Sequence, residues 1–315
     1  MTVVIVGGAG FVGLNIAEAL LARGTAVTLF DAGPPPDAAL AAFAGLPGTL
    51  KVVTGDVTQP RSIAATLACG AEAMVYGAAI TAGPERDAVE PERILDVNLL
   101  GLVHALRAAR EAGVRRVVNL SSAGAYGAAG LAHDVLTEES PADPVSLYAL
   151  SKFASERVTA RMADAWDIAA VSVRLSAVFG RWERRTSARD TPSPPYQVME
   201  AALAGRPVRL PRRDWRDYIY APDVAAAVLA LLDARRLRYP LYNVSTGIRW
   251  SLADWAGELA RHMPLDWAMT ESPREATVDF HSPRDRGMLD ITRLVEETGF
   301  APRYDLAASA ADYAA

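Results

Sequence analysis

The sequence predicts a doubly wound α/β fold, in which helices cover both faces of a parallel sheet, with a smaller, discontinuous C-terminal substrate domain. Short β-branched segments alternate with helical patterns of apolar residues through the first 120 residues. These segments are apolar on both faces, as in a parallel sheet buried between two layers of helices. After residue 180 the alternation gives way to a segment rich in arginine and proline, which indicates that a different unit begins there.

The expected elements follow one another in order along the chain. Strands are expected at 2–6, 26–30, 50–54, 73–79, 116–121, 169–175 and 242–244, and helices at 11–23, 95–112, 145–165, 221–234, 251–262 and 292–298. Pro222 suits the first turn of a helix, Ser251 suits an N-cap, and Gly299 suits a helix end. Residues 181–195 are aperiodic and are expected to form a loop or a lid. We expect a dinucleotide-binding domain at 1–176 plus about 220–245, and a substrate domain at 177–219 plus 246–315.

The composition excludes several classes of protein. The chain has 315 residues and is 51% hydrophobic, which is too apolar for a disordered chain. Its longest apolar run, at about 224–232, is far shorter than the ~18 residues that span a bilayer. The N-terminus has no basic segment typical of a signal peptide, and the single cysteine, Cys69, excludes an intrachain disulfide. We therefore expect a cytoplasmic protein without a membrane, and its pI of about 5.5 argues against a nucleic-acid partner.

Lysine is rare in this chain. Only Lys51 and Lys152 occur among 32 basic residues, and the other 30 are arginine. A position that has remained lysine therefore calls for an explanation, whereas a cluster of arginines is weaker evidence than it would be elsewhere.

A glycine-rich loop joins the first strand to the first helix. Gly7, Gly10 and Gly13 are spaced three apart, which permits a tight turn, a close approach of the backbone to a pyrophosphate, and packing of the helix on the strand. The free N–H groups at the start of that helix would face the phosphates. Asp31 closes the second strand, where a carboxylate accepts hydrogen bonds from a ribose and repels a 2′-phosphate. The arrangement predicts NAD rather than NADP, although a ligand-free turn and a solvated aspartate are the simpler alternatives.

A tyrosine and a lysine lie four residues apart in the long helix at 145–165. This spacing places Tyr148 and Lys152 on one face. A tyrosine with its ordinary pKa of ~10 is a poor base at neutral pH, and we expect the ammonium and a nicotinamide ring to lower that pKa. Ser122 lies at the carboxyl end of the fifth strand, where doubly wound sheets bind ligands, and its hydroxyl could hold a substrate oxygen.

These motifs together resemble the extended short-chain dehydrogenases/reductases, and more narrowly the NAD-dependent epimerase/dehydratase family. The resemblance rests on Gly7-x-x-Gly10-x-x-Gly13, Asp31, Gly55-Asp56-Val57, Ala78-Ala79, Asn98, Ser121-Ser122, Tyr126-Gly127, Tyr148-x-x-Ser151-Lys152, Arg174-x-x-x-Val178-Phe179-Gly180, Arg216-Asp217-Tyr218, Asp223-Val224 and Tyr242-Asn243-Val244. It runs in order over nearly the whole chain.

The resemblance implies a Rossmann domain, NAD as cofactor and a role for each motif. Tyr148 would be the general base or acid, Ser122 would assist it, and Lys152 would also bind the nicotinamide ribose. The expected cofactor-binding residues are Gly7, Gly10, Phe11, Val12, Gly13, Asp31, Asp56, Val57, Ala78, Ala79, Asn98, Tyr148 and Lys152. Asp56 would contact the adenine, and Asn98 would be structural rather than catalytic. Relatives often dimerise through helices that correspond to about 92–112 and 146–164, so we expect a homodimer.

Two positions depart from the pattern of the family. Ala123-Gly124 follows Ser122, where dehydratases have an Asp-Glu pair that eliminates water, so a dehydratase mechanism is not expected. Ala177 stands where members that act on nucleotide sugars usually have an asparagine that reaches the diphosphate, which weakens the case for such a substrate.

Arginines around the expected substrate site nevertheless favour an anionic, sugar-like substrate. The expected substrate-binding residues are Ser122, Tyr148, Ala177, Arg184, Arg185 and Arg216. Arginines at 181, 189, 212, 213, 284 and 286 could also serve, because a guanidinium clamps a phosphate or carboxylate with two hydrogen bonds. The alternative is a solvated surface in an arginine-rich protein. Trp182 and Trp215 could be walls of the site or simply packing residues. We expect no metal.

Three functions fit this reading. The leading hypothesis is an NAD-dependent dehydrogenase that removes hydride from a secondary alcohol, with Tyr148 as the base. The alternative is an epimerase of a sugar or nucleotide sugar that returns the hydride to the other face and retains its cofactor. A non-catalytic NAD-binding sensor is less favoured, because Ser122, Tyr148 and Lys152 are all present.

Overall fold

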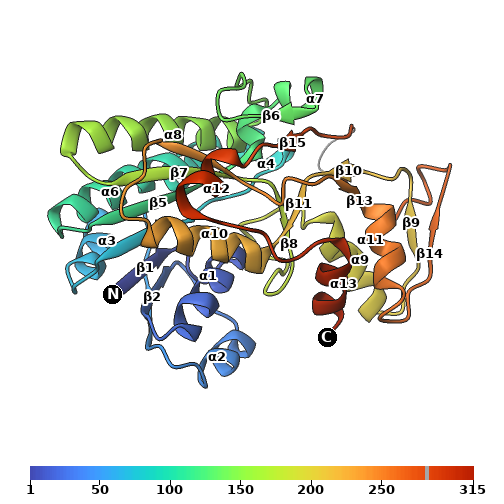
Figure 1. Cartoon of the computed structure of the whole chain (residues 1–315), viewed down its shortest axis with the longest axis horizontal. Coiled ribbons are helices and arrows are strands. Elements are labelled where there is room, and N and C mark those ends of the chain that lie inside the picture. Colours follow the sequence, from blue (N-terminus) through green and yellow to red (C-terminus); the bar gives the residue numbers. More distant parts are fainter. Residues whose placement is uncertain (281–283) are drawn as a thin grey trace.

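A seven-stranded parallel sheet forms the centre of the molecule in the computed structural model, which describes residues 1–280 and 284–315 (Figure 1). The strands lie in the order β12-β7-β5-β4-β1-β2-β3. Their bounds are β1 Thr2–Val6, β2 Ala26–Asp31, β3 Leu50–Thr54, β4 Ala73–Tyr76, β5 Arg116–Ser122, β7 Ala170–Leu175 and β12 Leu241–Val244. This arrangement confirms the predicted doubly wound α/β class.

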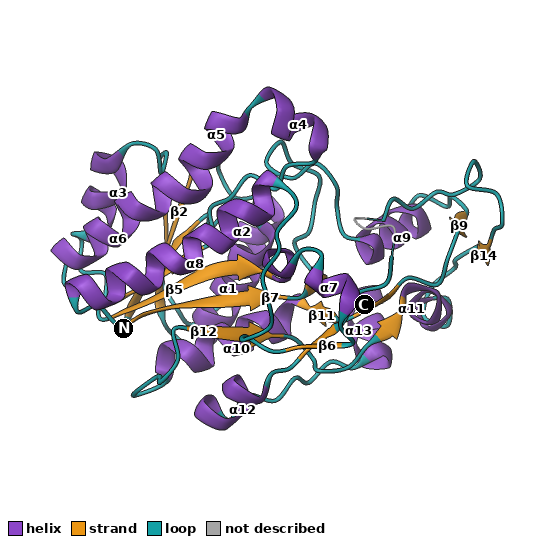
Figure 2. Cartoon of the chain, turned by 90° about the horizontal axis from the view of Figure 1, so that it is seen from above, coloured by secondary structure: helices purple, strands orange, loops and turns teal. Residues whose placement is uncertain are grey.

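Helices cover the two faces of the sheet (Figure 2). One layer comprises α3 Pro60–Leu67, α5 Pro91–Leu95, α6 Gly101–Glu111 and α8 Leu147–Trp166, and the other comprises α1 Phe11–Ala22, α2 Asp37–Phe43, α10 Ala221–Asp233 and α12 Thr292–Thr298. Alternate residues of β1 show why both layers form. Val3 and Ile5 pack in one apolar core and Val4 and Val6 in the other, because successive side chains of a strand point to opposite faces.

A third apolar core lies beyond the carboxyl ends of the strands. It is built around Phe179, whose ring contacts Tyr218, Trp250 and Trp255 at centroid distances of 6.2, 5.7 and 5.5 Å. The surrounding elements are β8 Ala177–Phe179, α9 Pro194–Leu203, β9 Val208–Leu210, β10 Trp215–Arg216, β11 Tyr218–Tyr220, β13 Trp250–Ser251, α11 Leu252–Leu259, β14 Trp267–Met269 and α13 Leu306–Ala314. Figure 1 shows these helices gathered at the end toward which β5 and β7 point.

Some elements differ from those expected. The expected helix at 95–112 is interrupted by a π-helical turn at Asp96–Leu100, and the expected loop at 181–195 ends where α9 begins at Pro194. Leu294 and Phe300, expected in the substrate domain, pack in the core of the central sheet. Short elements also follow β4 and β5, namely α4 Pro84–Val89, a 3-10 turn Ala123–Tyr126, α7 Ala129–Ala132 and β6 Val135–Leu136, which pairs with β15 Met288–Leu289.

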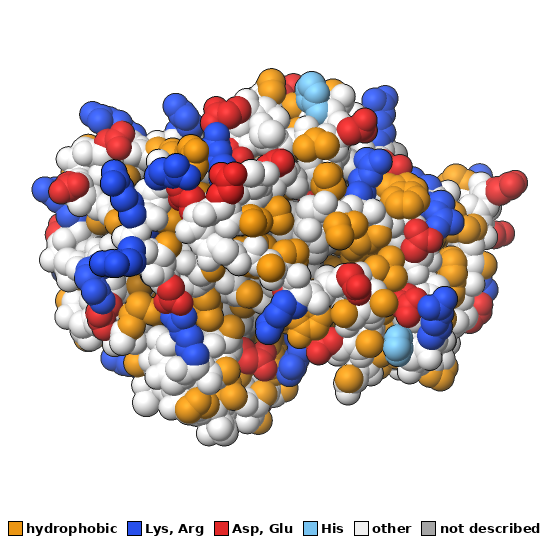
Figure 3. Space-filling view, in the orientation of Figure 1, with side chains coloured by type: hydrophobic (Ala, Val, Ile, Leu, Met, Phe, Trp, Pro, Cys, Tyr) orange, Lys and Arg blue, Asp and Glu red, His pale blue; other side chains and the backbone are white. Residues whose placement is uncertain are grey.

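Acidic and basic side chains are interspersed over the face seen in Figure 3, without a broad area of one sign.

Within the described residues, none of the helices combines the length and apolar character that crossing a bilayer requires.

Asp217 ties three segments together near the site. Its carboxylate accepts hydrogen bonds from the hydroxyls of Ser245 and Thr246 and, at 2.7 Å, from the backbone N–H of Leu289. Burial raises the pKa of Asp217 to about 7, against the hydrogen bonds from Ser245, Leu289 and Thr246, which lower it.

We expect Asp217→Asn to become more stable relative to the wild type as the pH rises. Because the pKa is raised in the folded state, the stabilisation is complete below the unfolded pKa of about 4 and is lost as the pH rises through about 7. At about 1.4 kcal/mol per pH unit, the wild type should lose roughly 2–3 kcal/mol from this group between pH 5 and pH 8, whereas asparagine does not titrate. Urea unfolding of both proteins at the two pH values measures the difference, and equal losses would contradict the prediction.

Candidate active site

The glycine-rich loop is shaped by close backbone approaches. Gly7 has a φ of +77°, and a Cβ there would lie 2.5 Å from the backbone nitrogen of Ala78. A Cβ on Gly13 would lie 2.5 Å from the carbonyl oxygen of Gly7. The N-cap of α1 is Gly10, which offers no side chain to its first N–H groups. Phe11 and Val12 begin the helix, so their N–H groups face outward from its positive end, as binding of a phosphate requires.

Gly13→Ala should weaken NAD binding by at least tenfold, because the added methyl group would push α1 away from the loop that it supports. Gly45→Ala is a matched control, since a Cβ on Gly45 meets nothing within 4 Å. Titration of each purified variant with NAD measures the effect. An unchanged dissociation constant for Gly13→Ala would refute the assigned role of this contact.

Two carboxylates follow the second and third strands. Asp31 ends β2 and accepts hydrogen bonds from the N–H groups of Ala9 at 3.0 Å and Gly33 at 3.3 Å, so it lies directly against the glycine-rich loop. Asp56 accepts from the N–H of Thr58 at 2.9 Å and pairs with Arg93 at 3.2 Å. Burial raises the pKa of Asp56, but its bonds with Thr58 and Arg93 outweigh that effect and leave the pKa below its ordinary value.

The segment after β4 forms the opposite wall of the expected cofactor site. Ala78 and Ala79 are partly buried there, and Ala78 packs against the apolar core that contains the buried Val57. Asn98 holds this segment in place, because its amide accepts from the N–H of Ile80 at 2.7 Å and donates to the carbonyl of Ile80 at 3.1 Å and to Ser151 at 2.9 Å. These contacts agree with a structural role for Asn98.

Tyr148 is brought together with two hydroxyl groups. The hydroxyls of Ser122 and Thr81 lie beside the Tyr148 hydroxyl, where both lower its pKa. Ser122 Oγ also accepts the N–H of Gly124 at 3.0 Å, which leaves the serine proton free for the tyrosine oxygen. Burial raises the pKa of Tyr148, while Ser122, the charge of Arg189 and Thr81 lower it by less. The protein's own groups therefore leave the pKa of Tyr148 above its ordinary value, and the lowering expected from the ammonium together with a nicotinamide ring stays a prediction.

Lys152 lies beneath the ring of Tyr148. Its ammonium donates to the carbonyl of Leu120 at 2.7 Å and lies 5.9 Å from the centre of the Tyr148 ring. Burial lowers the pKa of Lys152 to about 8, against the charge of Glu156, which raises it. Lys152 therefore remains mostly protonated at neutral pH.

A buried ion pair supports this lysine from the next turn of α8. Both oxygens of Glu156 accept from Arg174, at 2.9 and 2.7 Å, and Oε1 also accepts from Ser121 at 2.6 Å. The guanidinium of Arg174 lies 4.3 Å from the centre of the Tyr126 ring. Sequence reasoning assigned no role to Glu156, and its position four residues after Lys152 was the available signal.

Two guanidiniums meet beside Ser122. Arg216 is buried, and its Nε donates at 2.8 Å to Asp214, while its buried Nη2 has no hydrogen-bond partner among the described residues. Arg286 donates to the carbonyl of Ala123 at 2.9 Å, one residue after Ser122. Burial and the charge of Arg216 lower the pKa of Arg286 to about 10, against Asp214, which raises it. Positive charge therefore exceeds negative charge at this point, which suits an anion.

The other predicted substrate residues lie in different surroundings. Ala177 begins β8 and pairs with Tyr218, two residues after Arg216. Arg184 reaches the glycine-rich loop, where it donates at 2.8 Å to the carbonyl of Ala9. Arg185 is 61% exposed and pairs with Glu200 at 2.8 Å, so the structure does not bring it to the site.

Most of the remaining candidate arginines form ion pairs, and Trp182 packs against an aromatic ring. Trp182 donates to Glu18 at 2.7 Å and packs edge-on against Phe43, and Trp215 lies in β10. Ion pairs join Arg181 to Glu18, Arg189 to Glu183, Arg212 to Asp214 and Asp285, and Arg213 to Asp254.

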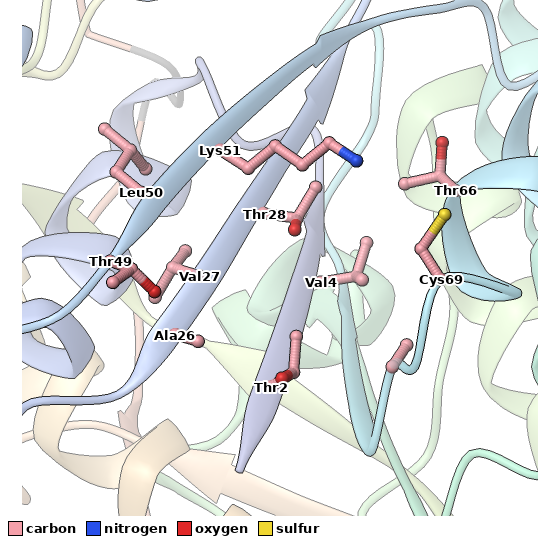
Figure 4. A pocket seen from close by; sticks show the side chains of 11 residues that line it. Thr2, Val4, Ala26, Val27, Thr28, Thr49, Leu50, Lys51, Thr66 and Cys69 are labelled. Atoms are coloured by element: carbon pink, nitrogen blue, oxygen red, sulfur yellow. The ribbon is translucent and has the colours of Figure 1, made fainter.

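Two cavities lie apart from these residues. One of about 230 Å³ opens at the amino ends of β1–β3, where the side chain of Lys51 points toward Thr66 and Cys69 (Figure 4). Another of about 620 Å³ lies between α9 and α13. Neither cavity is lined by the candidate catalytic residues Ser122, Tyr148 and Lys152.

Comparison with known proteins gives consistent matches over the whole chain. The model of the NAD dependent epimerase/dehydratase family matches residues 3–245. A curated UDP-glucose 4-epimerase of Mycolicibacterium smegmatis is 28% identical over 322 residues, or 98% of this chain and 95% of the relative. The structure of the Thermus thermophilus UDP-glucose 4-epimerase with NAD has a TM-score of 0.78 at 26% identity, covering 100% of this chain and 98% of the other. The structure of the Bacillus cereus UDP-glucuronic acid 4-epimerase with UDP-glucuronic acid and NAD has a TM-score of 0.81 at 18% identity. It covers 100% of this chain and 99% of the other, and at this identity the likeness shows only that the two proteins share a fold.

Proposed function

Because this chain belongs to the NAD-dependent epimerase/dehydratase family and uses NAD, we propose that it is a cytoplasmic epimerase that inverts one carbinol of a UDP-sugar. The Mycolicibacterium smegmatis relative and the Thermus thermophilus structure both carry the name UDP-glucose 4-epimerase. An epimerase performs the same first step as a dehydrogenase, the removal of hydride from a secondary alcohol, and then returns the hydride to the other face.

The residues at the carboxyl ends of β1, β2 and β4 fit NAD. The approach of Gly7 to Ala78 leaves no room for a Cβ between the two strands, and the uncapped start of α1 offers N–H groups to a pyrophosphate. Asp31 would hold the adenosine ribose, and Lys152 the nicotinamide ribose. When bound, NAD accepts the hydride of the carbinol carbon and can return it.

The proton of the carbinol moves to Tyr148 in this proposal. Ser122 would orient the carbinol oxygen, and the hydroxyls of Ser122 and Thr81, which both lower the pKa of Tyr148, would favour the phenolate. Lys152 supplies a positive charge on the same face of α8, and the buried Glu156 carboxylate keeps that lysine protonated. The positive nicotinamide ring would provide the further lowering of the tyrosine pKa that the protein's own groups do not.

The pair formed by Arg216 and Arg286 is the observation that carries the choice of an anionic sugar. A buried guanidinium nitrogen without a partner is costly unless a ligand satisfies it. A diphosphate between the two arginines would accept from Arg216 Nη2 and neutralise the excess charge. Ala177 cannot supply the amide usual at its position, so these arginines would carry more of the anchoring.

Incubation of the purified protein with UDP-glucose, UDP-galactose, UDP-glucuronic acid and UDP-N-acetylglucosamine tests the proposal. We expect one of them to yield its isomer by chromatography without net NADH absorbance at 340 nm. Net NADH formation would instead identify a dehydrogenase, and an absence of both reactions with all four would refute a UDP-sugar substrate.

We also propose that two copies associate through the helical layer that contains α5 and α8. Leu95 in α5, Leu100 in the adjoining π-helical turn and Leu150 in α8 are large apolar side chains, and each is at least 38% exposed. A second copy covering this layer would bury them, as in the four-helix bundle of relatives.

A further inference from the structure

Residues 181–190, here called the strap, span the carboxyl edge of the sheet from α1 to α4. One end is tied to α1. Asn15 donates at 2.7 Å to the carbonyl of Arg181, and Trp182 donates at 2.7 Å to Glu18. These bonds place the start of the strap against the helix that carries the glycine-rich loop.

The other end of the strap is tied to the segment after β4. Asp190 pairs with Arg86 at 3.2 Å and accepts the N–H of Gly83 at 2.8 Å. Thr81 donates its N–H to the carbonyl of Ala188 at 2.7 Å. The strap therefore connects the two walls of the NAD site, which are the loop after β1 and the segment after β4.

Arg184 is the cation that the strap places at the glycine-rich loop. Its Nη2 donates to the carbonyl of Ala9 at 2.8 Å, whereas its buried Nη1 has no hydrogen-bond partner within the part of the chain that the structure describes. Among the residues that the structure describes, no acidic side chain pairs with Arg184. Arg189 also lies near the loop, 5.9 Å from the centre of the Phe11 ring, but it is neutralised by Glu183 at 2.9 Å.

We propose that Arg184 binds the pyrophosphate of NAD rather than the substrate, and that the strap holds it there and slows release of the cofactor. A pyrophosphate at the start of α1 would accept from the unpartnered Nη1 and would be covered by the strap. A cofactor held in this way suits an enzyme that returns its hydride in each cycle. The inference rests on NAD as the cofactor and does not require the identity of the sugar.

Release of labelled NAD from the loaded protein into an excess of unlabelled NAD tests the inference. Arg184→Ala should release NAD about tenfold to hundredfold faster than the wild type, as expected for loss of a charge-assisted hydrogen bond. Arg185→Ala, the adjacent exposed arginine, should release it at the wild-type rate. Asp190→Ala, which removes the tie to Arg86 far from the loop, should also accelerate release.

Binding of fragments separates a pyrophosphate contact from general damage to the loop. Arg184→Ala should weaken binding of ADP-ribose, which contains the pyrophosphate, and leave binding of adenosine unchanged. Equal weakening of both fragments, or release of NAD at the wild-type rate by either Arg184→Ala or Asp190→Ala, would overturn the inference. Because no sugar is present, these results are independent of whether any UDP-sugar is isomerised.

Discussion

Tyr148→Phe should lower the turnover number by about 10²- to 10⁴-fold, the usual contribution of a positioned general base. The substitution removes the one oxygen that faces Ser122 and Thr81 and retains the ring above Lys152. Without that oxygen, no group accepts the hydroxyl proton of the substrate while its carbinol carbon loses hydride. The loss should appear in the turnover number rather than in the Michaelis constant, because the proposed anchor of the substrate, Arg216 with Arg286, is untouched.

Two measurements separate this loss from a folding defect. Tyr148→Phe should still bind NAD, because the glycine-rich loop and Lys152 are untouched, and its far-UV spectrum should be unchanged. Tyr239→Phe, which changes a half-buried tyrosine whose ring contacts the guanidinium of Arg293, is a matched control that should retain full activity. Turnover by Tyr148→Phe within tenfold of the wild type would show that another group carries the proton.

Glu156→Ala should lower the free energy of unfolding by about 3–5 kcal/mol, because it leaves the buried Arg174 without its carboxylate. Both side chains of this pair are less than 5% exposed, so water cannot replace the lost contacts. The variant should also lose activity, since Glu156 raises the pKa of Lys152 and its removal would allow the lysine to lose its proton at a lower pH. Urea unfolding measures the first effect, and the pH profile of turnover measures the second.

A double variant tests whether the unpaired charge causes the loss of stability. Glu156→Ala combined with Arg174→Met removes both charges and should recover part of the stability lost in the single variant. Asp233→Ala, which breaks the exposed pair between Arg23 and Asp233, should cost no more than about 1 kcal/mol. If the losses of unfolding free energy in Glu156→Ala and in Arg174→Met alone add up to the loss in the double variant, the two residues do not form a coupled ion pair.

The sheet could be predicted because its strands are short, β-branched and apolar on both faces. The strand at 50–54 and the helix at 292–298 were expected with the bounds that the structure shows. The π-helical turn at Asp96–Leu100 could not be predicted, because the apolar pattern continues through it and only packing against α8 distinguishes it. Helix α9 was missed because its first residues, Pro194 and Pro195, were interpreted as part of a loop.

The catalytic site was predictable where residues lie near one another in sequence. Tyr148 and Lys152 share a helix face, and Ser122 ends a central strand, so local spacing sufficed. The contact of Thr81 with Tyr148 and that of Arg184 with Ala9 join segments distant in sequence, and no local pattern indicates them. The direction in which the pKa of Tyr148 shifts could not be predicted from the sequence either. Burial makes the largest contribution to that shift, and burial depends on the folded structure.

The rarity of lysine in this chain helped to identify Lys152 as a candidate functional residue. Lys152 is buried beneath Tyr148, where a compact ammonium reaches the carbonyl of Leu120. Lys51, in contrast, is exposed beside a cavity at the opposite edge of the sheet.

The most direct test of the central claim is the fate of the carbinol hydrogen when the reaction runs in D₂O. If hydride passes to bound NAD and back while Tyr148 handles only the hydroxyl proton, the inverted carbon retains its original hydrogen. Proton NMR of the isomer formed from the UDP-sugar that the panel identifies should therefore show no deuterium at that carbon. Incorporation of solvent deuterium there would mean that the carbon loses a proton instead of a hydride, and would contradict the account.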